Sequence, residues 1–182
     1  MHTTRVITLL LLALYCLVST ATLADHLPEA KIARGKADTI LSGVDVYHST
    51  IRQAIKKLGP PTSAEVIPEK NDIAGGKRYE WKTEKTNLLL VTWNDKGEDS
   101  VPYSAEVWGA VPAGKIGITG RGLKLGAMLT DVRRIYGPRF SKSKRDDGTW
   151  QIIVQWQDQT TLYLYFDKTG HVGHMHLMAA IE

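Results

Sequence analysis

The chain has 182 residues, a formal net charge of +4 at pH 7 and a single cysteine, Cys16. This charge is too small to indicate nucleic-acid binding, which calls for a strongly basic surface. Because Cys16 lies in the N-terminal apolar segment, the rest of the chain can form neither an internal disulfide nor a thiol-based catalytic site, and its stability must come from an apolar core.

Residues 1–24 have the pattern of a secretory signal peptide. Arg5 supplies the positive charge, residues 6–18 form the apolar run, and Thr22 and Ala24 provide the small residues of a cleavage site. The apolar run is short for a membrane span, and a retained anchor is the alternative. Bulky Tyr15 before Cys16 argues against lipidation. Since the chain also lacks an Asn-x-Ser/Thr acceptor, we expect a periplasmic or secreted bacterial protein.

The first predicted helix follows an N-terminal arm at 25–46 and begins after Thr50. Thr50 and Gln53 have the spacing of a capping box. Gly59 and Pro60 provide the signal that ends the helix. Between these signals, apolar residues recur with helical periodicity at Ile51, Ala54, Ile55 and Leu58.

Three strands are predicted after this helix, at 79–81, 88–97 and 105–109. A linker at 110–121 leads to a second region that repeats this order, with a helix ending at Gly137 and Pro138 and strands at 152–156, 162–170 and 174–179. Such short helices are unstable alone and have to pack on a sheet. The sequence therefore predicts an α+β fold of tandem αβββ repeats, at 47–109 and 122–182, forming an antiparallel sheet with the short helices packed on one face.

Alternation along each strand separates residues that face the helices from residues on the opposite, open face. In the second repeat the predicted inward set is uniformly apolar: Ile152, Val154, Trp156, Leu162, Leu164, Phe166, Met175, Leu177 and Ala179. The predicted outward set is Gln151, Ile153, Gln155, Tyr163, Tyr165, His174 and His176. Aligning Trp93 with Phe166 predicts that Leu89, Val91 and Trp93 point inward in the first repeat. Its outward set would be Glu80, Leu88, Leu90, Thr92, Glu106 and Trp108.

The outward residues mix aromatic rings, imidazoles, amides and isolated aliphatic side chains, which is typical of a recognition surface. From this composition we expect the partner-binding residues to be Trp108, Tyr163, Tyr165, His174 and His176. Two alternatives stay open. The arm at 25–46 or a contact between the repeats covers this face, or the aromatic residues are present for their strand propensity alone.

Of all the sequence features, a histidine cluster at 171–176 is the most similar to a metal-ligand pattern. The cluster contains His171, His174 and His176. His174 and His176 share a strand face and could both reach one metal ion, and a third ligand would have to come from elsewhere, such as Glu106 or His48. We expect these histidines to be polar residues of the open face, with no metal and no cofactor bound.

Catalytic motifs are not recognisable in the sequence. It contains no Gly-x-Ser-x-Gly motif, and Gly120, Gly122 and Gly126 lack dinucleotide-binding spacing. We therefore expect a non-enzymatic protein. The densest basic stretch is interpreted either as a solvated helix face and loop or as a contact for an acidic partner or anionic lipid headgroups. It consists of Arg133, Arg134, Arg139, Lys142, Lys144 and Arg145.

The helix ending in Gly-Pro, the following strands and the tandem order resemble the β-lactamase inhibitor protein-like superfamily, and the small outer-membrane assembly lipoproteins have a related single unit. The residues that carry the resemblance are Gly122 to Gly126, Val132, Tyr136 to Pro138, Trp156, Phe166 and Asp167, echoed by Ile55, Leu58 to Pro60 and Trp81. The resemblance covers about 43–182 and implies a tandem repeat fold, export and protein binding on a concave aromatic sheet. Two departures are the missing disulfides and the missing lipidated cysteine, so a β-lactamase target does not follow.

These observations together predict an exported, non-enzymatic module that binds another protein through the open sheet face. The alternative is a periplasmic or surface factor that binds a small ligand or an envelope lipid, for which the basic stretch is the supporting feature.

Overall fold

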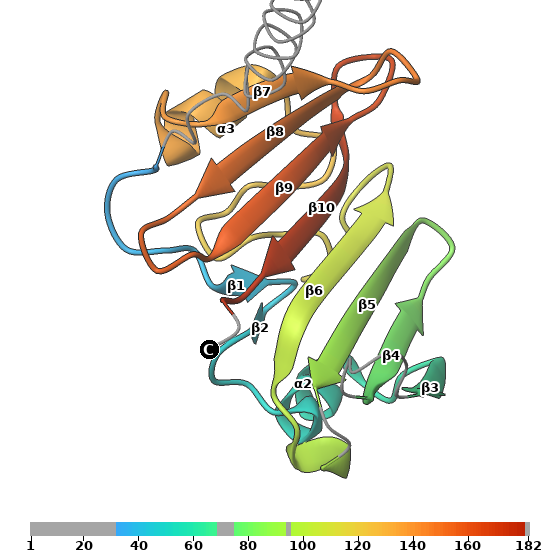
Figure 1. Cartoon of the computed structure of the whole chain (residues 1–182). Coiled ribbons are helices and arrows are strands. Elements are labelled where there is room, and N and C mark those ends of the chain that lie inside the picture. Colours follow the sequence, from blue (N-terminus) through green and yellow to red (C-terminus); the bar gives the residue numbers. More distant parts are fainter. Residues whose placement is uncertain (1–31, 69–74, 94–95, 181–182) are drawn as a thin grey trace, which may run out of the picture. The chain divides into compact units, whose positions relative to one another are not determined.

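An eight-stranded antiparallel sheet forms the frame of the structure, in the order β3-β4-β5-β6-β10-β9-β8-β7 (Figure 1). The computed structural model describes residues 32–68, 75–93 and 96–180. The predicted signal peptide, Cys16 and residues 25–31 of the arm lie outside the described residues. The strands are β3 (Ser63–Ile67), β4 (Gly76–Lys82), β5 (Thr86–Trp93), β6 (Pro102–Gly109), β7 (Ser141–Lys144), β8 (Trp150–Gln155), β9 (Thr161–Phe166) and β10 (Val172–Met178).

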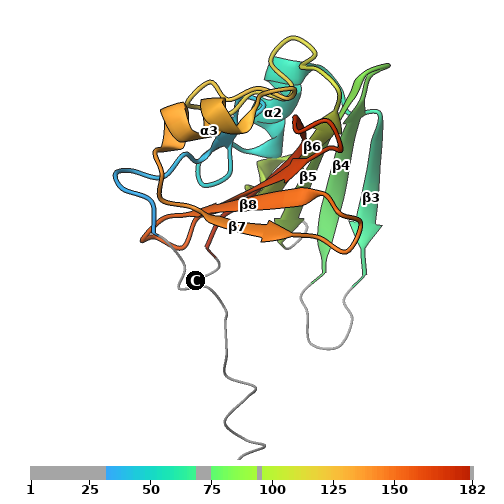
Figure 2. The same cartoon turned by 90° about the horizontal axis from the view of Figure 1, so that it is seen from above.

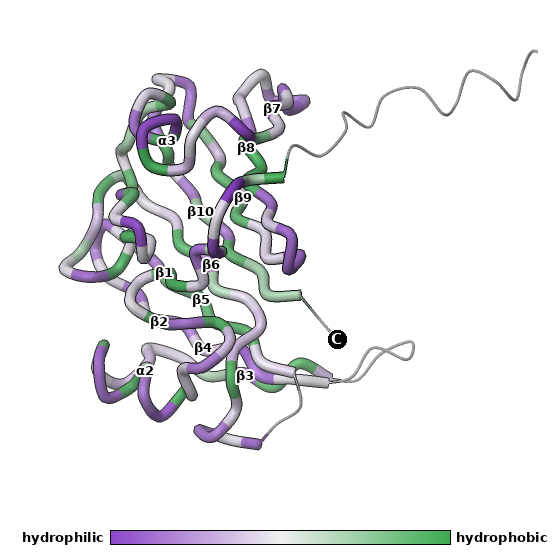
Figure 3. The backbone as a smooth tube through the Cα atoms, turned by 90° about the vertical axis from the view of Figure 1, so that its left-hand side faces the viewer, coloured by the Kyte–Doolittle hydropathy of each residue, from purple (hydrophilic) through white to green (hydrophobic). Residues whose placement is uncertain are grey.

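Two short helices lie on the same side of this sheet, together with the segment that joins β6 to the second helix (Figure 2). They are α2 (Ile51–Leu58) and α3 (Leu129–Tyr136). The hairpin of β1 (Ile40–Leu41) and β2 (Val44–Asp45) and a 3-10 turn, η1 (Gly97–Asp99), complete the described elements. Hydrophilic and hydrophobic segments alternate along both helices, as expected for elements with one buried face (Figure 3). The broad α+β expectation is confirmed.

Helix α2 begins and ends where the sequence predicts, and α3 ends at the predicted Gly137. At the start of α2, the Thr50 Oγ1 accepts a hydrogen bond from the Gln53 amide at 3.3 Å, and the Gln53 Oε1 accepts one from the Thr50 amide at 3.0 Å. At its end, Gly59 has a φ of 85°, which disfavours residues with a Cβ, and its amide donates to the Ile55 carbonyl. Gly137 ends α3 in the same way, with a φ of 76°.

Each helix is followed by four strands, not by the three that the sequence predicts. The additional strands, β3 and β7, are the two outer strands of the sheet. Strand β3 is mostly exposed, and β7 reads Ser-Lys-Ser-Lys. An edge strand with little apolar surface to bury shows no apolar alternation, so the pattern that identifies the inner strands was absent here.

The core lies between the sheet and the helices, and the predicted facing of β8, β9 and β10 is confirmed. The predicted facing of β5 is wrong. Leu88 and Leu90 are fully buried on the helix side, whereas Leu89, Val91 and Trp93 are half-buried on the opposite side. Because residues 88–91 are apolar on both faces, this strand has no alternation that could set the register, and the pairing with β4 and β6 decides it.

The described part of the N-terminal arm contributes to the core on the helix side. Leu41, Val44 and Val46 are buried there, and the Ser42 amide donates to the Ile118 carbonyl at 2.8 Å. Residues 32–46 therefore do not cover the open face. The alternative that the arm covers this face is wrong for this part of the arm.

A buried hydrogen-bond cluster joins the arm to α3. The Tyr136 hydroxyl donates to Asp38 Oδ2 at 2.7 Å and lies 2.7 Å from Thr119 Oγ1, while the Arg121 amide donates to the same Asp38 oxygen at 3.0 Å. Burial and the adjacent Asp38 carboxylate raise the pKa of Tyr136, so the phenol keeps its proton and remains a donor.

The Tyr136→Phe substitution should lower the free energy of unfolding by about 1–3 kcal/mol, because it removes the phenol hydroxyl that donates to the buried Asp38 carboxylate. Urea denaturation measures this loss. In an Asp38→Ala background the same substitution should cost much less, since the acceptor is already absent. Additive effects of the two substitutions would contradict the proposed coupling between the arm and α3.

Candidate functional site

The five residues predicted to bind a partner lie next to one another on the open face. Trp108 on β6 pairs with His174 on β10, which pairs with Tyr165 on β9. In the adjacent cross-strand row, Glu106 pairs with His176, which pairs with Tyr163. We refer to these six residues as the aromatic–histidine patch: Glu106, Trp108, Tyr163, Tyr165, His174 and His176. It spans β6, β10 and β9, and so includes the β6–β10 pairing, where the two groups of four strands join.

The rings of the patch are packed against one another. Tyr165 and His174 are stacked with ring centroids 4.5 Å apart, and Tyr163 and Tyr165 are nearly parallel at 6.5 Å. Trp108 meets His174 edge-on at 6.3 Å. The Tyr165–His174 stack covers one face of each of these two rings, while the contacts of Trp108 with His174 and of Tyr163 with His176 are edge-on and tilted, respectively. The same packing limits the rotamers available to these side chains.

Two polar contacts fix the imidazoles. His174 Nε2 lies 2.7 Å from Glu106 Oε1, and the side chains are 27% and 29% exposed, respectively. His176 Nε2 lies 2.8 Å from Ser104 Oγ. The hydrogen bond from His174 lowers the pKa of Glu106 against the opposing effect of burial, and the charges of the histidines and Arg78 lower it further. Burial lowers the pKa of His176, an effect that Glu106 opposes and His174 reinforces.

Arginine side chains lie on both sides of the patch. The Arg145 guanidinium is 5.0 Å from the Tyr165 ring centroid, a distance that permits a cation–π contact. Burial raises the pKa of Tyr165, and the charge of Arg145 opposes this. On the other side, Arg78 similarly opposes the rise that burial causes in the pKa of Tyr103.

A second aromatic pair on this face was missed by sequence reasoning. Trp93 and Tyr103 stack with centroids 4.6 Å apart. Aligning Trp93 with Phe166 predicts a core position for Trp93. The pairing of Leu89 with both Glu80 and Glu106 shows instead that Leu89, Val91 and Trp93 face outward. The corrected outward set of the first half therefore loses Leu88, Leu90 and Thr92 and gains three residues: Leu89, Val91 and Trp93.

The three clustered histidines have separate partners. His171 Nδ1 lies 2.9 Å from Thr169 Oγ1 in the turn before β10, apart from the contacts of His174 and His176. His48 lies 3.2 Å from Asp45. Among the residues that the structure describes, no group of three or more His, Cys, Asp or Glu side chains is arranged to hold a metal ion.

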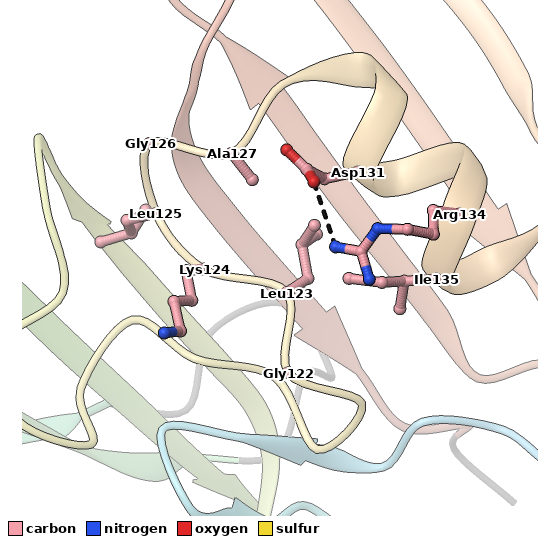
Figure 4. A pocket seen from close by; sticks show the side chains of 9 residues that line it. All are labelled: Gly122, Leu123, Lys124, Leu125, Gly126, Ala127, Asp131, Arg134 and Ile135. Atoms are coloured by element: carbon pink, nitrogen blue, oxygen red, sulfur yellow. Dashed lines mark hydrogen bonds and ion pairs between the residues drawn. The ribbon is translucent and has the colours of Figure 1, made fainter.

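A cavity of about 450 Å³ lies on the helix side, away from the patch, between α3 and the segment that precedes it (Figure 4). Arg134 and Asp131 form an ion pair at 3.1 Å along its wall. The described residues that line it include no hydroxyl, thiol or imidazole side chain. The lining residues are Gly122, Leu123, Lys124, Leu125, Gly126, Ala127, Asp131, Arg134 and Ile135.

None of the helices within the described ranges is long and apolar enough to cross a membrane.

Comparison with known proteins finds similarity at the level of structure. No protein-family model matches the chain, and no curated protein matches it in sequence. An extracellular protein containing a SCP domain, from Bacillus anthracis, is 14% identical with a TM-score of 0.48, over 85% of this chain and 50% of that chain. A DUF4309 family protein (YjgB) from Bacillus subtilis is 16% identical with a TM-score of 0.44, over 76% and 83%.

A third solved structure is that of a candidate β-lactamase inhibitor protein from Streptococcus mutans, which is 16% identical with a TM-score of 0.32, over 75% of this chain and 88% of that chain. At these levels of identity and structural agreement, the similarities assign neither a family nor an activity to the chain.

Acidification should destabilise the protein through His176. Because its folded-state pKa is lowered below the ordinary value of 6.5, the histidine contributes stability that is fully present above pH 6.5 and is lost as the pH falls through the lower folded-state value. His176→Gln should therefore reduce the decrease in unfolding free energy between pH 7 and pH 5, measured by chemical denaturation at each pH. His48→Gln, at a side chain that is 81% exposed, provides the control. Identical pH dependence in both variants would refute a role for His176.

Proposed function

We propose that the protein is an exported, non-enzymatic module that binds another protein through the aromatic–histidine patch. The observation that carries this proposal is the position of the patch. Its residues lie side by side on the sheet face opposite the helices, and the described part of the arm packs on the helix side.

The composition of the patch supports a binding role. Tyrosine and tryptophan residues supply a large share of the energy at protein interfaces, whereas a solvated sheet face is mostly charged or short and polar. The stacked rings and the Glu106–His174 contact already restrict the side chains, so binding would lose less conformational entropy. A preorganised surface of this kind favours complex formation.

A polypeptide suits this surface better than a flat ligand that stacks on an aromatic ring. One face of His174 and one face of Tyr165 are directed at each other, and the Arg145 guanidinium lies 5.0 Å from the Tyr165 ring centroid, so few ring faces are left for a flat ligand to stack on. The exposed edges and polar atoms can instead meet the mixed apolar and hydrogen-bonding groups of a protein surface. This proposal does not include a β-lactamase as the partner.

We also infer that regions 47–109 and 122–182 are two copies of one unit, joined by the linker at 110–121. The supporting features are a helix of eight residues that ends at a Gly-Pro pair in each region, four strands after each helix, and a strand order that runs outward from the β6–β10 pairing in both directions. We propose, in addition, that residues 1–24 are a signal peptide and that the protein is periplasmic or secreted in a bacterium.

The double substitution Trp108→Ala and Tyr165→Ala should weaken partner binding at least tenfold, because truncating buried interface aromatics costs about 2 kcal/mol or more. Capture from native envelope extract, identification by mass spectrometry and titration with the purified partner measure this effect. The melting temperature should change by only a few degrees, since both side chains are half-buried on the open face.

Trp150→Ala is a matched control, because Trp150 is an exposed tryptophan on the helix side of the same sheet. It should leave partner binding unchanged. Undiminished binding by the double variant would exclude the patch, and a large loss of stability would assign its rings to the core instead.

A further inference from the structure

An apolar hollow is present at the β7 edge of the sheet, on the side of the helices and away from the aromatic–histidine patch. Its volume is about 190 Å³. Trp150, which borders it, is 41% exposed, and Met128 at the start of α3 is 51% exposed. The described residues that line the hollow are Leu129, Lys142, Trp150, Ile152, Phe166 and Gly170.

The exposed tryptophan belongs to the core-facing side of β8. Trp150 pairs with Phe166 and lies two residues before the buried Ile152, so its side chain is on the face that the helices cover elsewhere. Here α3 reaches the hollow only with Leu129. The helices therefore cover the sheet only partly at the β7 edge.

Cationic side chains surround the hollow. Lys142 Nζ lies 3.9 Å from the Trp150 ring centroid, and Lys144 is the cross-strand partner of Trp150. Arg133 lies one helical turn after Leu129 and so shares its side of α3. All three cations are exposed. The whole segment 133–145 contains six Lys and Arg residues and no carboxylate.

Two acidic residues in the adjacent turns, Asp147 and Asp167, are hydrogen-bonded within those turns. Asp147 accepts a hydrogen bond from the Thr149 amide at 2.9 Å, and Asp167 accepts one from the Thr169 amide at 2.9 Å. These contacts direct both carboxylates into their own turns. Lysines on an edge strand also guard against strand pairing with other molecules, which accounts for Lys142 and Lys144 but not for the exposed Trp150 and Met128 beside them.

We infer that this edge, formed by Met128, Arg133, Lys142, Lys144 and Trp150, is a contact site for an anionic lipid surface. Tryptophan favours the interface between headgroups and acyl chains, and lysine can lay its aliphatic stem along apolar surface while its ammonium group meets phosphate. The hollow is smaller than the 300–1,000 Å³ typical of small-molecule sites, and it can take the end of an apolar chain. Charge complementarity selects anionic lipids.

The test is co-sedimentation of the purified protein with phosphatidylglycerol vesicles and with phosphatidylcholine vesicles. We expect binding to the anionic vesicles that weakens with added salt, and at least tenfold weaker binding to the zwitterionic ones. Lys142→Gln with Lys144→Gln should reduce binding about 25-fold, since each lysine near an anionic surface contributes about fivefold. Trp150→Ala should reduce it several-fold.

Lys82→Gln with Lys85→Gln is the matched control, because it removes the same charge from exposed positions in the first half of the sheet. It should retain the binding of the unmodified protein. An equal loss in this control, or equal binding to both vesicle types, would overturn the inference. Displacement by soluble glycerol phosphate at the same phosphate concentration would also overturn it, by indicating a site for a free anion.

The near-ultraviolet circular dichroism spectrum of each variant reports whether its fold is retained. Trp108→Ala with Tyr165→Ala should bind vesicles normally, so failure of the lipid site and failure of the protein-binding patch are distinguishable.

Discussion

The antiparallel pairing of β6 with β10 is the constraint on which the rest of the structure depends. It joins two groups of four strands into one sheet, and its register places Glu106 opposite His176 and Trp108 opposite His174. A shift of β10 by one residue against β6 would turn His174 and His176 into the core and bring Met175 to the surface. Burial of the apolar set on one face therefore also fixes the composition of the other face.

The unequal cover of the two faces follows from the shortness of the helices. Each helix has eight residues and ends at a glycine with a positive φ, so it buries one apolar stripe and extends no further. The β1–β2 hairpin and the segment before α3 fill the remaining space on that side. Trp150 remains exposed beside the start of α3, where the helix reaches the sheet only with Leu129.

The open face combines packing with electrostatics that suit a binding surface. Stacked rings and the Glu106–His174 contact hold the side chains in place, at the cost of partly burying ionisable groups such as His176. Proteins accept such costs at sites where an additional function depends on them. The patch and the lysine-rich edge lie on opposite sides of the sheet, so a protein partner and a lipid surface could be bound without competition.

The sequence by itself determined the two helices, their Gly-Pro ends, the inner strands and the facing of the second half, because capping residues and clear alternation act over a few neighbouring positions. It also indicated that the five partner-binding candidates share the open face. Only the tertiary structure decided the facing of β5, the presence of β3 and β7, and the contacts between Glu106, Ser104 and the two histidines. Strand 88–91 is apolar on both faces and the edge strands have little to bury, so their positions depend on pairing with strands that are distant in sequence.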